Sequence, residues 1–211
     1  MLLSKIKNIS KGIVLDNELM SKHTSYGIGG KVLAYIRPFN KYELIKIIKL
    51  LNEQNSKIYF VGSGSNLLVN DKKINAYIIT PAKALKLFKI DDNIISAESG
   101  VMLGKVVKES IKHNLTGLEG LVGVPGTLGG AIMMNAGAWG AEISNYLISV
   151  DIVCNNGVIK KLYPDDIEFK YRYSSFSSNE FILSAKFKLN KASRTEINRR
   201  KLIASRGRIK S

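Results

Sequence analysis

Glycine dominates the middle of the chain, where residues 120–140 read Gly120-Leu-Val-Gly-Val-Pro-Gly-Thr-Leu-Gly-Gly-Ala-Ile-Met-Met-Asn-Ala-Gly-Ala-Trp-Gly140. Eight of the 18 glycines fall in residues 117–140, where an even distribution would place about two. The run is too short and too poor in proline for collagen, although five glycines are spaced by three. Pro125 and the many glycines disfavour a helix. We therefore expect a long loop whose backbone comes very close to a ligand or to another segment.

Two further glycine clusters precede this stretch. Residues 62–66 read Gly-Ser-Gly-Ser-Asn directly after a strand-like run, and residues 27–30 read Gly-Ile-Gly-Gly. Successive backbone amides in such turns can bind an anion without a lysine. Neither cluster is a standard nucleotide motif, because Leu67 stands where a dinucleotide fingerprint has its third glycine and no Gly-Lys-Ser/Thr occurs. Each cluster alone fits an ordinary turn, but three together favour a phosphate-containing ligand such as a dinucleotide.

Apolar periodicity predicts the first half of the fold. Residues 41–54 indicate an amphipathic helix whose apolar face carries Leu44, Ile45, Ile48 and Leu51. Strand-like runs follow at residues 57–61 and 76–80. This pattern is typical of a βαβ-like unit.

The second half of the chain also combines strand-like runs with an amphipathic helix. We expect strands at residues 94–98, 149–154, 158–162 and 181–187, with a hairpin turn at Asn156-Gly157. A second amphipathic helix carries Leu103, Val106, Val107 and Ile111. The chain is therefore expected to be α+β, with an N-terminal lobe (1–80) and a larger second lobe (81–190). Residues 191–211 are basic, and the sequence leaves open whether they form a surface helix or a frayed tail.

Composition limits the function classes. Of the 211 residues, 45% are hydrophobic and 23% charged, which is typical of a globular protein. No apolar run is long enough to span a membrane, and no signal peptide is evident. The net charge of +15 lies at the two ends, whereas residues 61–185 carry twelve cations and twelve anions. Nucleic-acid binding is therefore not the favoured function, and we expect a cytoplasmic protein without a membrane span.

Four motifs in order resemble a known family. They are His23-Thr-Ser-Tyr-Gly-Ile-Gly-Gly30, Val61-Gly-Ser-Gly-Ser-Asn-Leu-Leu-Val69, the segment from Gly117 to Gly140, and Phe169-Lys-Tyr-Arg-Tyr-Ser-Ser-Phe176. From first to last they span about residues 20–180, which is most of the chain. The chain resembles the UDP-N-acetylenolpyruvoylglucosamine reductase family of peptidoglycan precursor synthesis, which has a vanillyl-alcohol-oxidase/PCMH-type FAD-binding fold.

The resemblance implies a two-lobed cradle for FAD, with NADPH as hydride donor and an enolpyruvyl UDP-sugar as substrate. Arg172 matches the arginine that stabilises the enolate-like intermediate, and a guanidinium suits this role because it stays charged. The cofactor-binding residues expected from the resemblance are Tyr26, Gly62, Ser63, Gly64, Ser65, Asn66, Leu67, Gly123, Val124, Pro125, Gly126, Thr127, Gly129, Gly130, Asn135, Ala136, Gly137 and Ala138.

The sequence departs from the family pattern after Phe176. In the family, a serine of a third domain donates a proton and a glutamate near the C-terminus supports it. Ser205 and Ser211 do not stand in that context, so neither is assigned the role. We expect an FAD-binding oxidoreductase that lacks the substrate domain and turns over slowly. The alternative is a non-catalytic flavin-binding or regulatory module that needs a partner chain for the missing domain.

Other reactive side chains have simpler interpretations. His23 and His113 are too few for a metal site, and none is expected. Cys154 is expected to be a buried small hydrophobe. Asp165 and Asp166 follow Pro164 and indicate a helix start rather than a paired acid site.

Overall fold

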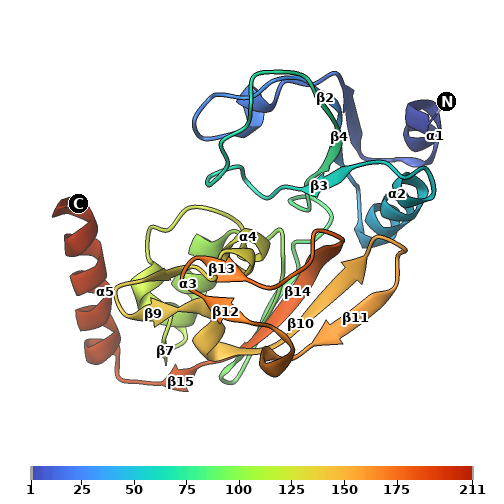
Figure 1. The fold of residues 1–211 in the computed structure, drawn as a ribbon. Helices are drawn as coiled ribbons and strands as arrows, with labels where there is room; N and C mark the ends of the chain where they lie inside the picture. The colour runs from blue at the N-terminus through green and yellow to red at the C-terminus, as the bar shows by residue number, and fades with distance from the viewer. Residues whose placement is uncertain (1, 211) are drawn as a thin grey trace.

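Two separate β-sheets organise the computed structural model, which describes residues 2–210, with side chains up to Gly207 (Figure 1). The first is four-stranded, in the order β1-β2-β4-β3. Its strands are β1 (Ile13–Asp16), β2 (Val32–Arg37), β3 (Ile58–Phe60) and β4 (Ile74–Ile79). The pairs β2–β4 and β3–β4 are parallel, as the βαβ-like pattern predicts, whereas β1 runs antiparallel to β2.

Two helices accompany this sheet, α1 (Leu2–Ile9) and α2 (Lys41–Glu53). Asn40 caps α2, because its side chain accepts a hydrogen bond from the amide of Glu43. The buried apolar residues of α2 recur at the spacing of one helical face, at Leu44, Ile47, Ile48 and Leu51. Ile45, expected on this face, is only half-buried, because Ile47 takes the inward position.

The second sheet is antiparallel throughout, in the order β11-β10-β14-β6-β5. Its strands are β5 (Phe88–Asp91), β6 (Ile94–Glu98), β10 (Leu147–Cys154), β11 (Ile159–Leu162) and β14 (Glu180–Lys188). The turn at Asn156-Gly157 joins β10 to β11, with Gly157 at φ +80°. Cys154 is half-buried, not buried as expected, because it ends β10 where the hairpin turns to the surface.

Helix α3 (Leu103–Lys112) accompanies the second sheet, together with the short helix α4 (Leu128–Met133). Small hairpins and 3₁₀ turns complete the fold: β7 (Leu115–Thr116) with β15 (Asn190–Lys191), β8 (Gly137–Ala138) with β9 (Ala141–Glu142), β12 (Phe169–Lys170) with β13 (Tyr173–Ser174), η1 (Met20–His23), η2 (Glu119–Leu121), η3 (Ile143–Tyr146) and η4 (Pro164–Asp166). In η4 the Asp166 carboxylate accepts from the Tyr163 amide, so the helix start expected there is observed.

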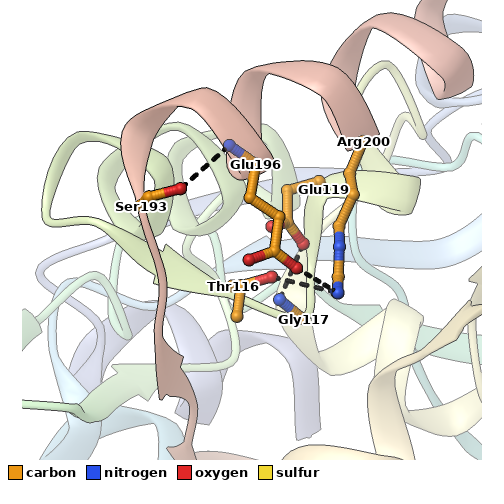
Figure 2. A network of polar contacts seen from close by, with 6 residues as sticks. All are labelled: Thr116, Gly117, Glu119, Ser193, Glu196 and Arg200. Carbon is orange, nitrogen blue, oxygen red and sulfur yellow. Dashed lines mark hydrogen bonds and ion pairs between the residues drawn. The ribbon is translucent and has the colours of Figure 1, made fainter.

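Residues 194–210 form the helix α5 (Arg194–Lys210), on the opposite side of the molecule from α1 and α2 (Figure 1). Ile197 and Ala204 of this helix are fully buried, and the helix packs against η2. Arg200 donates to the Thr116 hydroxyl at 3.2 Å and pairs with Glu196 one turn earlier (Figure 2). These contacts anchor the basic segment as a docked surface helix.

The two sheets share part of one hydrophobic core. The cluster under α1 and α2 includes Val153 of β10 and also Phe181 and Leu183 of β14. These strands belong to the second sheet, but these three residues pack in the same cluster as residues of the first sheet. The burial of this shared cluster fixes the sheets relative to each other and leaves a cleft between their neighbouring loops.

Candidate cofactor-binding cleft

The cleft lies between the two sheets and has a cavity volume of about 410 Å³, within the range of small-molecule and cofactor sites. The loop at residues 62–67 forms one wall, and the segment at residues 124–134, including α4, forms the facing wall. Among the residues predicted from the sequence, the cleft is lined by Gly62, Ser63, Gly64, Ser65, Asn66, Leu67, Val124, Pro125, Gly126, Thr127, Gly129, Gly130, Ala136 and Arg172.

The remaining predicted residues lie elsewhere. Asn135, Gly137 and Ala138 line a second hollow next to the cleft. Gly123 lines neither space, and Tyr26 is an exposed side chain outside both. Their roles in cofactor binding stay predictions.

The loop at residues 62–67 presents a row of free backbone donors. It begins where β3 ends, after the Val61 amide has bonded the Ile79 carbonyl. None of the amides of residues 62–67 donates to an atom of the described residues. Gly64 turns the loop at φ +69°, in a place where a Cβ would lie 1.9 Å from the His23 carbonyl oxygen. Consecutive unpaired N–H groups around a concavity bind an anion such as a diphosphate.

The facing wall contains the helix α4, which the sequence did not predict. We expected one long loop over residues 117–140, but α4 interrupts it. Thr127 caps this helix at its N-terminus, and tertiary contacts stabilise it. The first amides of α4 are already used: Leu128 donates to Val101, Gly129 donates to Ser99, and Gly130 is 3.4 Å from the Thr127 hydroxyl.

Only the amides of Gly126 and Thr127 remain free at the start of this wall, among the residues described. The resemblance implied that the loops at residues 62–66 and 123–130 would both hold the diphosphate. In the structure the loop at residues 62–67 holds most of the available donors.

Several residues of the cleft were missed by the sequence analysis. Phe60, Val61, Phe181 and Ile182 give it an apolar wall suited to an aromatic ring system. They come from strands β3 and β14 or their ends, where their apolar character predicted only core positions. Pro81, Ser99, Met133, Met134, Ala131 and Glu180 complete the lining. The one available signal was Ser99, a polar residue directly after the strand predicted at residues 94–98.

Arg172 stands at the turn between β12 and β13 and lines both the cleft and the second hollow. Its φ is +56°, an uncommon conformation for arginine that is often found at functional sites. The guanidinium carbon lies 5.5 Å from the centre of the Tyr171 ring. Within the described part of the chain the guanidinium has no hydrogen-bond or ion-pair partner, so it is available to an anionic ligand.

Two buried polar residues hold the Arg172 hairpin against α4. The Ser174 hydroxyl donates to the Met133 carbonyl at 2.6 Å. The Asn135 side-chain amide donates to the Lys170 carbonyl at 3.2 Å and to the Glu142 carboxylate at 3.3 Å. Asn135 therefore positions the hairpin that carries Arg172.

His23 makes packing and hydrogen-bond contacts within the fold, away from the cleft. Its ring stacks on Tyr35 at 3.8 Å between centroids and bonds the Glu18 carboxylate at 3.1 Å. His23 does not line the cleft. In residues 2–210 no group of three or more His, Cys, Asp and Glu side chains is arranged to hold a metal ion.

Comparison with known proteins decides the family. Residues 32–163 match the model of the FAD binding domain family. This chain belongs to that family. The match includes both walls of the cleft.

Curated relatives agree with the resemblance expected from the four motifs. The chain is 38% identical over 200 residues to the UDP-N-acetylenolpyruvoylglucosamine reductase of Streptococcus mutans, covering 94% of this chain and 65% of the relative. It is also 38% identical to the enzyme of that name from Clostridium kluyveri, covering 87% of this chain and 60% of the relative. The chain thus spans just under two thirds of the length of these relatives.

Solved structures confirm the fold. The UDP-N-acetylenolpyruvylglucosamine reductase (MurB) of Thermus caldophilus superposes with a TM-score of 0.79 at 26% identity, covering 95% of this chain and 70% of that one. A variant of Phl p 4, a glucose oxidase, has a TM-score of 0.65 at 13% identity and shares the fold. The α+β, PCMH-type FAD-binding fold expected from the sequence is confirmed. Among the described helices, none combines the length and apolar character needed to cross a bilayer.

Proposed function

We propose that the cleft binds FAD and that the chain acts as an NADPH-dependent reductase of UDP-N-acetylglucosamine enolpyruvate, in peptidoglycan precursor synthesis in the cytoplasm. The row of free amides at residues 62–67, inside a cleft with one apolar wall, supports this proposal most directly. The chain's likeness to reductases named for this substrate supports the choice of reaction.

The residues of the cleft fit the cofactor. The free amides of residues 62–67 would bind the diphosphate, since it needs several converging donors. Phe60, Phe181 and Ile182 would cover the ring system and exclude water from it. When bound, the flavin would supply the capacity to accept and donate a hydride. The unpaired guanidinium of Arg172 would then stabilise negative charge that develops on a substrate oxygen at the rim.

The first test separates cofactor binding from turnover. Protein incubated with FAD and passed through a desalting column should retain the visible flavin spectrum. Anaerobic addition of NADPH should bleach it, and the enolpyruvyl UDP-sugar should restore it. Protein that stays colourless contradicts the whole proposal, whereas bleaching without reoxidation contradicts only the assigned substrate.

We expect residues 1–211, assayed by themselves, to turn over slowly, because no described side chain of the cleft is assigned as proton donor to the substrate. Reoxidation at the roughly 10 s⁻¹ typical of enzymes would contradict this expectation. The alternative of a module completed by a separate partner chain gains no support from the comparisons.

The variant Arg172→Ala tests the proposed role of Arg172 in the transfer of a hydride to the substrate. It should still bind FAD and be bleached by NADPH, since the guanidinium lies at the rim. Reoxidation by the enolpyruvyl sugar should slow by about 10²–10³-fold, the usual effect of removing one charge-stabilising group. Equal reoxidation rates for both proteins would exclude Arg172 from the reaction.

A further inference from the structure

Ser99 has a buried hydroxyl that the fold itself does not use. The residue directly follows β6, and only 1% of its surface is exposed. Its amide donates to the Leu183 carbonyl at 2.9 Å, and its carbonyl accepts from the Gly129 amide at 2.9 Å. The side-chain oxygen has no hydrogen-bond partner among the described residues. The hydroxyl is thus the one polar group of Ser99 without a partner among the described residues, on a residue that lines the cleft.

Two other buried serine hydroxyls are paired. Ser110, fully buried in α3, donates to the Val107 carbonyl at 2.8 Å. Ser174 donates to the Met133 carbonyl at 2.6 Å. Because buried polar groups in folded proteins nearly always have partners, an unpaired hydroxyl on a residue that lines the cleft indicates a partner from outside the described residues.

The surroundings of Ser99 indicate the chemistry of that partner. A Cβ on Gly129 would lie 2.8 Å from the Cβ of Ser99, so Ser99 lies directly against the first turn of α4. Thr127, at the start of that turn, faces Gly62, where the row of free amides begins. A hydroxyl packed against the wall that faces these N–H donors is suited to an anionic oxygen, its strongest available acceptor.

We propose that Ser99 is a further ligand-binding residue, whose hydroxyl donates a hydrogen bond to a phosphoryl oxygen of the dinucleotide's diphosphate. This inference rests on the proposed function of the cleft and adds a donor that the sequence motifs did not include. It also explains why the hydroxyl is buried without a partner among the described residues.

Ser99→Ala tests the proposal through binding and stability together. The dissociation constant of FAD, from quenching of its fluorescence, should rise roughly 10-fold or more, as for loss of a hydrogen bond to a charged group. The inhibition constant of ADP as a competitor should rise by a similar factor, whereas that of riboflavin should stay unchanged. The thermal midpoint of the FAD-free variant should equal or exceed that of the wild type, because an unpaired buried hydroxyl has been removed.

Ser110→Ala is the matched control, since it removes a buried serine hydroxyl that is already paired within α3. It should lower the thermal midpoint and leave FAD affinity unchanged. Equal FAD affinity for wild type and Ser99→Ala overturns the inference, as does a loss that appears with riboflavin but not with ADP. If the wild-type protein itself binds no FAD, the proposed function fails instead, and the two failures are thereby distinguished.

Discussion

Gly62 shows how a missing side chain shapes the cleft. A Cβ at this position would lie 2.3 Å from the Thr127 side-chain oxygen on the facing wall. The two walls approach this closely because residue 62 has no side chain. Any larger residue would push the row of free amides away from α4.

We therefore expect Gly62→Ala to weaken FAD binding by at least about 10-fold, because one wall must shift before the diphosphate can be held. Gly104→Ala is the control: on α3 its Cβ would meet nothing within 4 Å. It should leave FAD affinity intact and stabilise the protein by about 0.5–1 kcal/mol. Fluorescence titration and denaturant unfolding measure the two effects. An unchanged FAD affinity in Gly62→Ala would contradict the assignment of the loop at residues 62–67 as a wall of the FAD site.

Glu43 is a buried carboxylate at the start of α2. The hydroxyl of Ser10 donates to it at 2.6 Å, and the amides of Lys11, Gly12 and Phe39 donate at 2.9, 3.2 and 3.2 Å. Burial alone would raise its pKa, but these hydrogen bonds to the charged form outweigh burial and hold the pKa below the ordinary value of 4.5. The carboxylate ties the segment after α1 to the first turn of α2.

Glu43→Gln should lower the free energy of unfolding by about 1–3 kcal/mol near neutral pH, because amide donors lose a charged acceptor. The pKa of Glu43 is lower in the folded state than in the unfolded state. Its carboxylate therefore stabilises the fold at pH values above the unfolded-state pKa, and this stabilisation is lost as the pH falls through the folded-state pKa. The difference between variant and wild type should therefore shrink below about pH 4. Denaturant unfolding at several pH values measures it, and a difference independent of pH would contradict this account.

At the scale of elements, the hairpin β12–β13 depends on α4 for its position. Asn135, two residues beyond the end of α4, adopts φ +39°, a conformation that asparagine tolerates better than most residues. Its side chain reaches the Lys170 carbonyl. The turn that carries Arg172 is thus held by a side chain from a distant part of the sequence.

Asn135→Ala should loosen this hairpin, because the Lys170 carbonyl loses its donor. We expect faster amide hydrogen exchange in residues 169–174, by about 5–30-fold for a local loss of 1–2 kcal/mol. Exchange in β10 should not change, which makes that strand the internal control. Uniformly faster exchange across the protein would indicate global destabilisation instead.

At the scale of the molecule, the shared core makes the two sheets one folding unit. Leu183 is fully buried in the cluster under α1 and α2, although it belongs to β14. Trp139, the chain's single tryptophan, lies on the far side, where a Cβ on Gly207 of α5 would meet its ring at 2.2 Å. The two positions report on opposite ends of the structure.

Leu183→Ala should lower the free energy of unfolding by about 2–5 kcal/mol, the range for large-to-small changes in a core. The thermal midpoints from Trp139 fluorescence and from far-ultraviolet circular dichroism should fall together. Met102→Ala, at a half-exposed side chain, is the control and should change stability by less than about 0.5 kcal/mol. A midpoint that falls in only one signal would show that the sheets unfold separately.

Local pattern was enough for much of this fold. The spacing of Leu44, Ile48 and Leu51 predicted α2, and Asn156-Gly157 predicted the β10–β11 hairpin, because both depend on neighbouring residues. The ordered glycine motifs were enough for the family. The helix α4 was missed, because its glycines have poor helix propensity and its stability comes from contacts with distant segments.

The sequence by itself determined the element pattern, the glycine-rich walls and the family to which the chain belongs. Only the tertiary structure decided which amides are free, since the partners of Leu128 and Gly129 are distant residues, Val101 and Ser99. It also placed the unpaired hydroxyl of Ser99 at the cleft and made Arg172 border two hollows. Hydrogen-bond satisfaction depends on segments that folding brings together, and no local sequence pattern records which donors remain unused.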